Sequence, residues 1–200
     1  MSRLATPTEM PRRQHIAVEG RNCWRRARAS RASFLVDGSS YFAALQAVLG
    51  EARHSILMLG WEIDSRVRLD PEAPSDGPPN ALGPLLDDLV RKRPGLEARI
   101  LIWESTFLFA LNREMLTGVK LDWLTNPRLI FRRDANHPIG ASHHQKMVVV
   151  DERLAFIGGI DLTQGRWDTP RHLHDDPRRV TAAGEPYPPF HDVEALIEGD

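Results

Sequence analysis

Hydrophobic and polar residues along the chain follow two different periods, one typical of strands and one typical of helices. Short apolar runs between turn-forming residues indicate buried strands, whereas apolar residues three and four positions apart indicate helices. Strands are predicted over residues 33–38, 55–63, 96–103, 128–134, 144–150 and 191–199. Helices are predicted over residues 39–53, 81–93 and 105–116. This alternation of strands and helices predicts an α/β domain built around a largely buried sheet.

Polar and turn-forming residues separate the predicted elements. Ser39 or Ser40 would cap the first helix, because a hydroxyl oxygen at that position can accept a backbone N–H bond. Residues 70–80 and 169–189 contain many Pro, Gly, Asp and other polar residues. Both segments are therefore predicted to be loops.

The first part of the chain differs in composition from the rest. Residues 1–31 are rich in arginine, which predicts a partly disordered leader before the α/β domain of residues 32–200. The alternative is an electrostatic contact between this leader and anionic lipid headgroups. Trp24 would then either anchor the leader at the membrane surface or simply pack on the domain.

The overall composition narrows the class of protein. Hydrophobic residues make up 42% of the chain and charged residues 26%, which is sufficient for a globular core. The net charge of −1 gives no general attraction to nucleic acid. Cys23 is the single cysteine, which excludes an internal disulfide and a cysteine-rich metal site. We find no signal peptide and no run of about 18 apolar residues, and we expect a cytoplasmic or peripheral membrane protein.

One predicted strand carries an unusual polar end. In the stretch HHQKMVVVDERLAFIGG, two-residue alternation places the side chains of His144 and Lys146 on one face of the strand. Val148 and Val150 continue that face and are suited to the core. The apolar part of the strand would therefore hold an imidazole and an ammonium group in fixed positions.

This pair of groups is suited to phosphoryl chemistry. An imidazole with an ordinary pKa of about 6.5 can act as a neutral nucleophile or as a proton donor near neutral pH. A nearby ammonium group can bind a phosphate oxygen and neutralise charge that develops during attack. His144 and Lys146 together therefore indicate cleavage of a phosphodiester without a metal ion.

The residues after this strand suggest supporting roles. Asp151 lies at an odd offset from His144, so we expect it to brace the turn and not to contact the reacting phosphorus. Gly158 and Gly159 are suited to a close backbone approach, either to a ligand or to another strand. Asp161 follows closely enough to line the same site.

The whole stretch resembles the HKD motif of the phospholipase D superfamily. That motif reads H-x-K, four residues, D, six residues, and then G-G or G-S. His144, Lys146, Asp151, Gly158 and Gly159 keep each of these spacings.

Flanking segments extend the resemblance. The motif with its surroundings covers about residues 138–165, and the continuation GGIDLTQGRWD is similar to the phospholipase D branch in particular. The segments LGWEID and PPFHDV are similar to that branch as well. The resemblance implies an α-β-α sandwich with a mixed sheet, as one half of a pseudo-twofold bilobal fold.

The resemblance also implies roles for individual residues. His144 would be the nucleophile that forms a phosphohistidine, Lys146 would bind the phosphate, and Asp151 would be the motif aspartate. Gly159 and Asp161 would lie in the substrate-binding part of the site. The implied reaction converts a glycerophospholipid to phosphatidic acid and a headgroup alcohol, or transfers the phosphatidyl group to another alcohol. The resemblance implies no cofactor and no metal ion.

The chain departs from the family in one respect. Phospholipases of this type carry two HKD motifs, whereas this chain carries one, since His172 and His174 are not followed by a lysine at the required position. We therefore expect either an N-terminal half that needs a C-terminal HKD half, or two copies that complete one site. The expected substrate is a phospholipid at a membrane surface, and no nucleic acid partner is expected.

The same residues are also consistent with several other functions. The same motif occurs in cardiolipin-synthase-like phosphatidyltransferases and in HKD nucleases, and a half-fragment would be inactive without its second half. A metal hydrolase would need a cluster of ligating side chains, for which the candidates are His137, His143, His144 and the pair His191-Asp192. We disfavour the metal hydrolase, because His191 is predicted to begin a strand. Residues 172–176, HLHDD, are expected to form a solvated loop.

Overall fold

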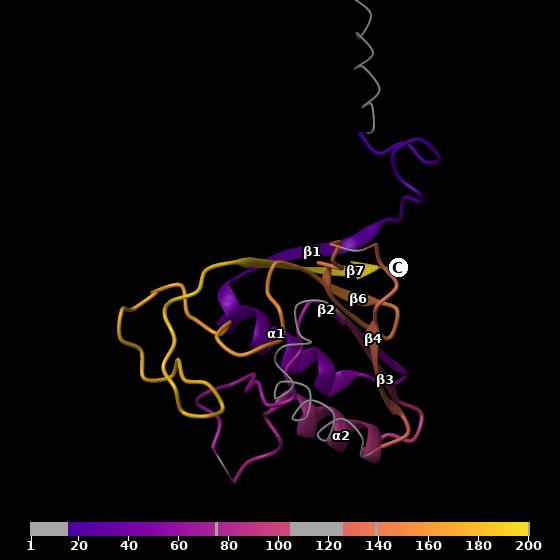
Figure 1. Ribbon diagram of the computed structural model, residues 1–200. Helices are drawn as coiled ribbons and strands as arrows, with labels where there is room; N and C mark the ends of the chain where they lie inside the picture. Colours follow the sequence, from indigo (N-terminus) through magenta and orange to yellow (C-terminus); the bar gives the residue numbers. More distant parts are fainter. Residues whose placement is uncertain (1–15, 75, 105–125, 139, 200) are drawn as a thin grey trace, which may run out of the picture.

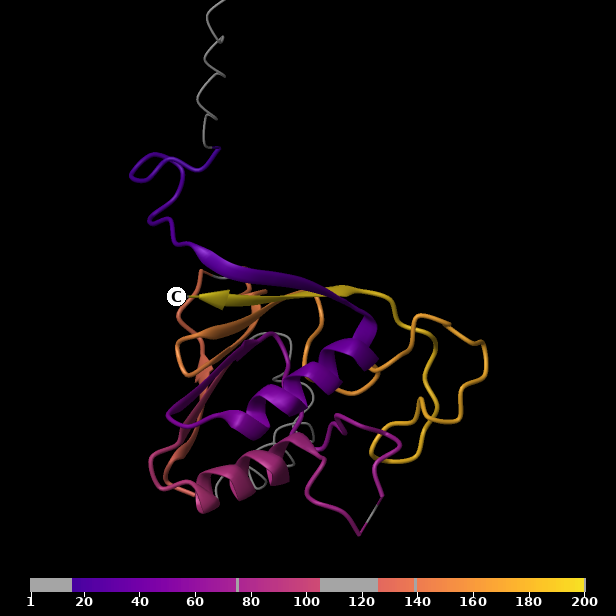
Figure 2. The same cartoon turned by 180° about the vertical axis from the view of Figure 1, so that it is seen from behind.

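The computed structural model describes residues 16–74, 76–104, 126–138 and 140–199, which form a seven-stranded sheet with two helices (Figure 1). The strands are β1 (Ala29–Val36), β2 (Ser55–Gly60), β3 (Glu97–Trp103), β4 (Leu129–Asp134), β5 (Lys146–Val150), β6 (Leu154–Gly158) and β7 (Val193–Gly199). The helices are α1 (Asp37–Glu51) and α2 (Leu82–Lys92). Figures 1 and 2 show α1 and α2 side by side on one face of the sheet.

The order of strands in the sheet is β1-β7-β6-β5-β2-β3-β4. Strands β2, β3 and β4 run parallel to one another, and the remaining neighbours pair antiparallel. The predicted α/β class with a mixed sheet is therefore confirmed. The helix predicted over residues 105–116 lies outside the described residues.

Some boundaries differ from those predicted. Strand β1 begins at Ala29, four residues before the predicted start, because its backbone pairs with β7 up to Gly199. Helix α1 begins at Asp37 and has no side-chain cap, so neither predicted serine cap forms. Strand β5 begins at Lys146, which leaves His144 just before the strand.

One face of the sheet forms the core with the helices. Phe156 pairs with Val148, Val148 with Met58, and Met58 with Ile100, so that one buried row crosses four strands. Directly paired residues share a face of the sheet, and this row belongs to the same buried cluster as the apolar residues of α1 and α2. Burial of such side chains is the main stabilising contribution to the fold.

The opposite face carries exposed apolar side chains at the β1 edge. Phe34 is paired with Ala195, which is paired in turn with Ile157, and Val36 is paired with Val193. We call these residues the outer apolar patch, which consists of Phe34, Val36, Ile157 and Val193. All four side chains are exposed, and Phe34 is 80% exposed. An exposed apolar surface beside an edge strand is typical of a surface that pairs with another chain or segment.

Gly158 lies between two charged side chains on the helix-covered face. It pairs with Lys146 of β5 on one side and with Glu194 of β7 on the other. A Cβ atom at Gly158 would overlap with the Glu194 carboxylate and with the Val193 carbonyl oxygen. The absence of a side chain at this position therefore gives the buried Glu194 carboxyl its space.

The Glu194 carboxyl is poorly solvated. It is completely buried, and Oε2 accepts the N–H of Ile160 at 3.3 Å, whereas Oε1 has no hydrogen-bond partner. Burial, with smaller contributions from Asp192 and Asp161, raises the pKa of Glu194 to about 7, although the Ile160 N–H and Lys146 oppose this rise. The fold therefore favours the protonated form of Glu194 at mildly acidic pH.

We predict that Gly158→Ala destabilises the fold by about 1–3 kcal/mol, because the added methyl group must displace β7 or Glu194. Gly50→Ala is the matched control, since Gly50 lies within α1 and an added Cβ there meets no atom within 4 Å. The control should gain about 0.5–1 kcal/mol from helix propensity. Urea unfolding measures both changes, and a Gly158→Ala protein as stable as the parent would contradict the packing.

We predict that Glu194→Gln changes how stability depends on pH. The unfolded carboxyl ionises near pH 4.5 and the folded one near pH 7, so the parent loses stability as pH rises through this window. The variant should lack this loss of stability, which amounts to at most about 3.5 kcal/mol at about 1.4 kcal/mol per pKa unit. Unfolding curves at several pH values test this, with Glu51→Gln at the exposed end of α1 as the control. A parent–variant difference that is independent of pH would refute it.

Candidate active site

Lys146 occupies a fixed position at the start of β5. Its side chain is only 7% exposed, and Nζ lies 3.2 Å from Oδ2 of Asp161. The same ammonium group donates a hydrogen bond of 3.3 Å to the carbonyl oxygen of His144. A buried charge is stable only with such partners, so these contacts determine where the ammonium lies.

His144 lies two residues before the start of the same strand. Its ring centroid is 5.2 Å from that of Trp61, and Nζ of Lys146 is 5.8 Å from the Trp61 ring centroid. His144 is exposed, whereas Lys146 is buried beneath it. The structure therefore brings the two predicted groups to one aromatic side chain, with the imidazole accessible from outside.

Asp161 connects the motif to the end of β2. Its Oδ1 accepts the backbone N–H groups of Trp61 at 3.1 Å and Glu62 at 3.4 Å, while Oδ2 faces Lys146. Both carboxylate oxygens are thus engaged within the protein. This geometry makes Asp161 a positioning residue for Lys146, and its contact with a substrate remains a prediction.

Asp151 lies at the far end of β5, about 16 Å of extended chain from Lys146. Its carboxylate accepts three backbone N–H groups, from Arg53 at 2.8 Å, His54 at 2.7 Å and Ser55 at 2.9 Å. Burial alone would raise the pKa of Asp151, but these N–H bonds lower it below its ordinary value. The residue braces the turns beside β2 and β5, as its offset indicates, and a catalytic role for it remains a prediction.

Gly159 allows β7 to approach the motif. A Cβ atom on Gly159 would overlap with the carboxylate of Asp192, just as one on Gly158 would overlap with Glu194. Of the two reasons considered for the glycine pair, the approach of another strand is the one that the structure shows. A contact of Gly159 with substrate remains a prediction.

Sequence reasoning did not identify the tryptophans beside the motif. Trp61 follows β2 directly, Trp103 ends β3, and their ring centroids are 5.7 Å apart. Since β2 and β3 are parallel, their carboxyl ends meet at one edge of the sheet, where ligands commonly bind. Each tryptophan lies at the end of a predicted strand, and this position in the sequence could have indicated that both lie near the site.

A small cavity lies next to these rings. It has a volume of about 70 Å³ and is lined by Leu59, Gly60, Leu101, Ile102, Trp103, Asp134, His143 and Gln145. His143 Nε2 lies 3.3 Å from Asp134 Oδ2 in its wall. This volume is far below that of a drug-sized ligand pocket, so the cavity by itself cannot enclose a phospholipid.

The histidines suggested for a metal hydrolase do not gather at one point. His137 and His143 lie together, with ring centroids 5.6 Å apart, but within the described part of the chain the one group of potential metal ligands combines His191 with Asp37 and His172 and includes neither of them. The metal-hydrolase set is therefore not supported.

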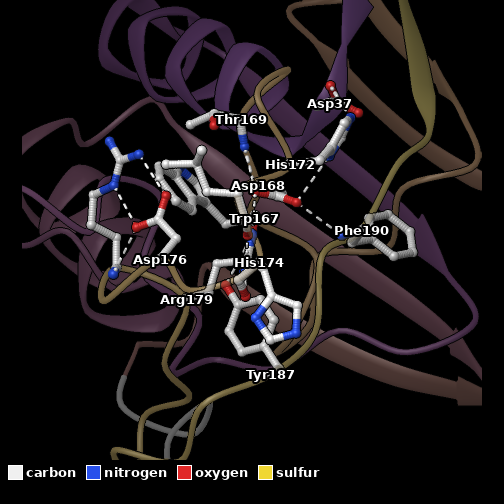
Figure 3. Close-up of polar contacts among 12 residues, drawn as sticks. Asp37, Trp167, Asp168, Thr169, His172, His174, Asp176, Arg179, Tyr187 and Phe190 are labelled. Carbon is white, nitrogen blue, oxygen red and sulfur yellow. Dashed lines mark hydrogen bonds and ion pairs between the residues drawn. The ribbon is translucent and has the colours of Figure 1, made fainter.

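The expectation of a solvated loop over residues 172–176 is wrong in part. His174 and Asp175 are exposed, but His172 lies 3.0 Å from the buried Asp168 (Figure 3). Asp176 is buried as well, against Arg178. The buried Arg179 donates hydrogen bonds to the carbonyl oxygens of Leu173 and His174, and His172 also lies 3.3 Å from Asp37. Asp37 is more than a hundred residues away in the sequence, so a local polarity pattern contains no sign of this contact.

Comparison with known proteins agrees with the motif. A family model described as Phospholipase D matches residues 48–199 of the chain. Phospholipase D C of Dictyostelium discoideum is 34% identical over 157 residues, and phospholipase D zeta 1 of Arabidopsis thaliana is 32% identical over 165 residues. These matches cover 76% and 79% of the chain but only 9% and 14% of the two relatives, so the chain spans a small part of their length.

A solved structure with a similar arrangement is that of Nuc from Salmonella typhimurium, a phospholipase D family member. The two chains are 16% identical in sequence. The superposition covers 84% of each chain and has a TM-score of 0.48. The family model covers well over half of the chain and includes the whole stretch from His144 to Asp161. The chain therefore belongs to the phospholipase D family.

Proposed function

We propose that this protein supplies one HKD half of a phosphodiesterase that cleaves glycerophospholipids through a phosphohistidine on His144. The observation that carries the proposal is the buried ion pair of Lys146 and Asp161 beneath an accessible His144. A fixed ammonium beside an exposed imidazole suits the binding and attack of a phosphate that approaches from outside the domain.

In the proposed first step, a ring nitrogen of His144 attacks the phosphorus and the bond to the headgroup oxygen breaks. The phosphatidyl group remains on His144, and the departing alcohol receives a proton from an acid outside this motif. Lys146 stabilises the negative charge that develops on the phosphoryl oxygens, and Asp161 keeps the ammonium in place. Water then attacks the phosphohistidine and releases phosphatidic acid, or an alcohol attacks instead and gives a new phosphatidyl ester.

The acid in this scheme requires a second HKD motif. We propose that a C-terminal HKD half, or a second copy of the chain, supplies it. The outer apolar patch supports a partner of this kind, because Phe34, Val36, Ile157 and Val193 are exposed beside the β1 edge of the sheet.

We further propose that the protein binds its phospholipid substrate at a membrane surface. No helix in the described residues has the length and apolar character needed to cross a bilayer. Trp24 is 90% exposed, so it does not pack on the domain, and arginines surround it in the sequence. An exposed aromatic ring among cationic side chains suits contact with anionic headgroups.

We predict that His144→Asn lowers phosphatidylcholine turnover in the active assembly by more than about 10²–10⁴-fold, since it removes the covalent route as well as proton transfer. Lys146→Met should also reduce turnover strongly, provided that circular dichroism shows an intact fold. His174→Ala is the control, because the His174 side chain is exposed and contacts the exposed Asp175. Headgroup release measures all three, and a His144→Asn enzyme within tenfold of the parent would rule out the assigned nucleophile.

We predict that activity requires two HKD motifs in one molecule or one oligomer. Light scattering gives the mass of the 200-residue chain, and a phosphatidylcholine assay on the same sample gives its activity. An inactive monomer supports a separate second half, and an active dimer supports completion by a second copy. Turnover by a monomer would contradict the need for a second motif, and cleavage of DNA without cleavage of lipid would favour the nuclease alternative.

A further inference from the structure

Three segments that are distant in the sequence meet where α1 begins. Asp37 is the first residue of α1 and is completely buried. His191 Nδ1 lies 2.6 Å from Oδ1 of Asp37, and His172 Nε2 lies 3.3 Å from Oδ2 (Figure 3 shows Asp37 and His172). We propose that Asp37, His172 and His191 form a site for a divalent transition-metal ion of the Zn²⁺ type, separate from the HKD residues.

The orientation of His172 is fixed from its other side. Its Nδ1 lies 3.0 Å from Oδ2 of Asp168, a buried carboxylate. Asp168 also accepts hydrogen bonds from the N–H groups of Thr169 and Phe190 and from Arg179 (Figure 3). A carboxylate that accepts the second N–H of a histidine is the usual outer support of a metal-ligating imidazole.

This support decides which nitrogen of His172 is free. Asp168 receives hydrogen bonds from the N–H groups of Phe190 and Thr169 and from the Arg179 guanidinium, so its carboxylate acts as an acceptor. His172 therefore donates from Nδ1, and in the neutral ring the lone pair of Nε2 faces Asp37.

Asp37 leaves a polar atom without a hydrogen bond at this point. Its Oδ2 is buried and has no hydrogen-bond partner, although Nε2 of His172 is 3.3 Å away. In the neutral form of His172 the two lone pairs at this separation repel each other, and either a proton on Nε2 or a metal cation between the two atoms would remove that repulsion. Two ligand atoms of a tetrahedral Zn²⁺ site, with bonds of about 2.0–2.1 Å, lie about 3.3–3.4 Å apart, which matches this separation.

The donor set favours one class of cation. Asp37, His172 and His191 each offer one ligand atom, and these three atoms all lie within 4.8 Å of one another. Two imidazole nitrogens and one carboxylate oxygen suit Zn²⁺ and similar ions, whereas Ca²⁺ and Mg²⁺ prefer oxygen ligands throughout.

The position of the site indicates a structural role for the ion. It would join the start of α1, the loop that contains His172 and the segment just before β7. Asp37 and His172 both have positive φ angles, 66° and 43°, which surrounding contacts must maintain. Because Asp192 follows His191 and contacts Gly159, the ion would also stabilise the approach of β7 to the HKD motif.

Calorimetric titration of the chelator-treated 200-residue chain with Zn²⁺, and separately with Ca²⁺, tests the site. We expect one Zn²⁺ per chain, much weaker Ca²⁺ binding, and a higher melting temperature with Zn²⁺. His172→Ala and His191→Ala should each weaken Zn²⁺ binding at least tenfold. His174→Ala is the matched control and should bind Zn²⁺ like the parent, because His174 lies outside the cluster.

His191→Ala is the decisive variant, because its side chain is 64% exposed and its loss threatens the fold least. Circular dichroism confirms that each variant is folded. Three results would each overturn the proposal: no Zn²⁺ binding by the folded parent, unchanged Zn²⁺ binding in His191→Ala, or tighter binding of Ca²⁺ than of Zn²⁺. The first result would mean that the hydrogen bond with His191, and not a metal ion, stabilises the buried Asp37 carboxylate.

Discussion

The buried ion pair between Lys146 and Asp161 is the interaction on which the rest of the site depends. The two side chains are 7% and 3% exposed, and removal of either partner would leave an unpaired charge in the protein interior. The pair joins the first residue of β5 to the segment after β6, and the second oxygen of Asp161 extends the connection to Trp61 after β2. One ammonium group thus links three parts of the sheet and supports the exposed His144 above it.

The order of the strands explains how this pair forms. β5 lies between β2 and β6, so its first residue is surrounded by the ends of both neighbours. Gly158 and Gly159 then allow β7 to bring Glu194 and Asp192 close to the same region. The glycine pair of the motif is therefore explained by packing within the sheet. The result is a concentration of acidic side chains around one lysine.

Local sequence patterns predicted much of this arrangement. The apolar periods located six of the seven described strands and both described helices to within a few residues, whereas β6 was not among the predicted strands. The motif spacing identified His144 and Lys146 as candidate site residues. The remainder depends on contacts between distant segments. Asp37 meets His172 and His191 across more than a hundred residues, and no period in the sequence encodes that contact. The predicted serine caps do not form, because α1 already begins at Asp37, before both Ser39 and Ser40.

The most direct test of the phosphohistidine mechanism is to trap the covalent intermediate on His144. The active assembly is mixed rapidly with a phospholipid, quenched under conditions that preserve phosphohistidine, digested and analysed by mass spectrometry. We expect a phosphatidyl group on the peptide that contains His144, formed within the first turnover. Rapid turnover with no adduct on this peptide, or with the adduct on a different residue, would contradict it.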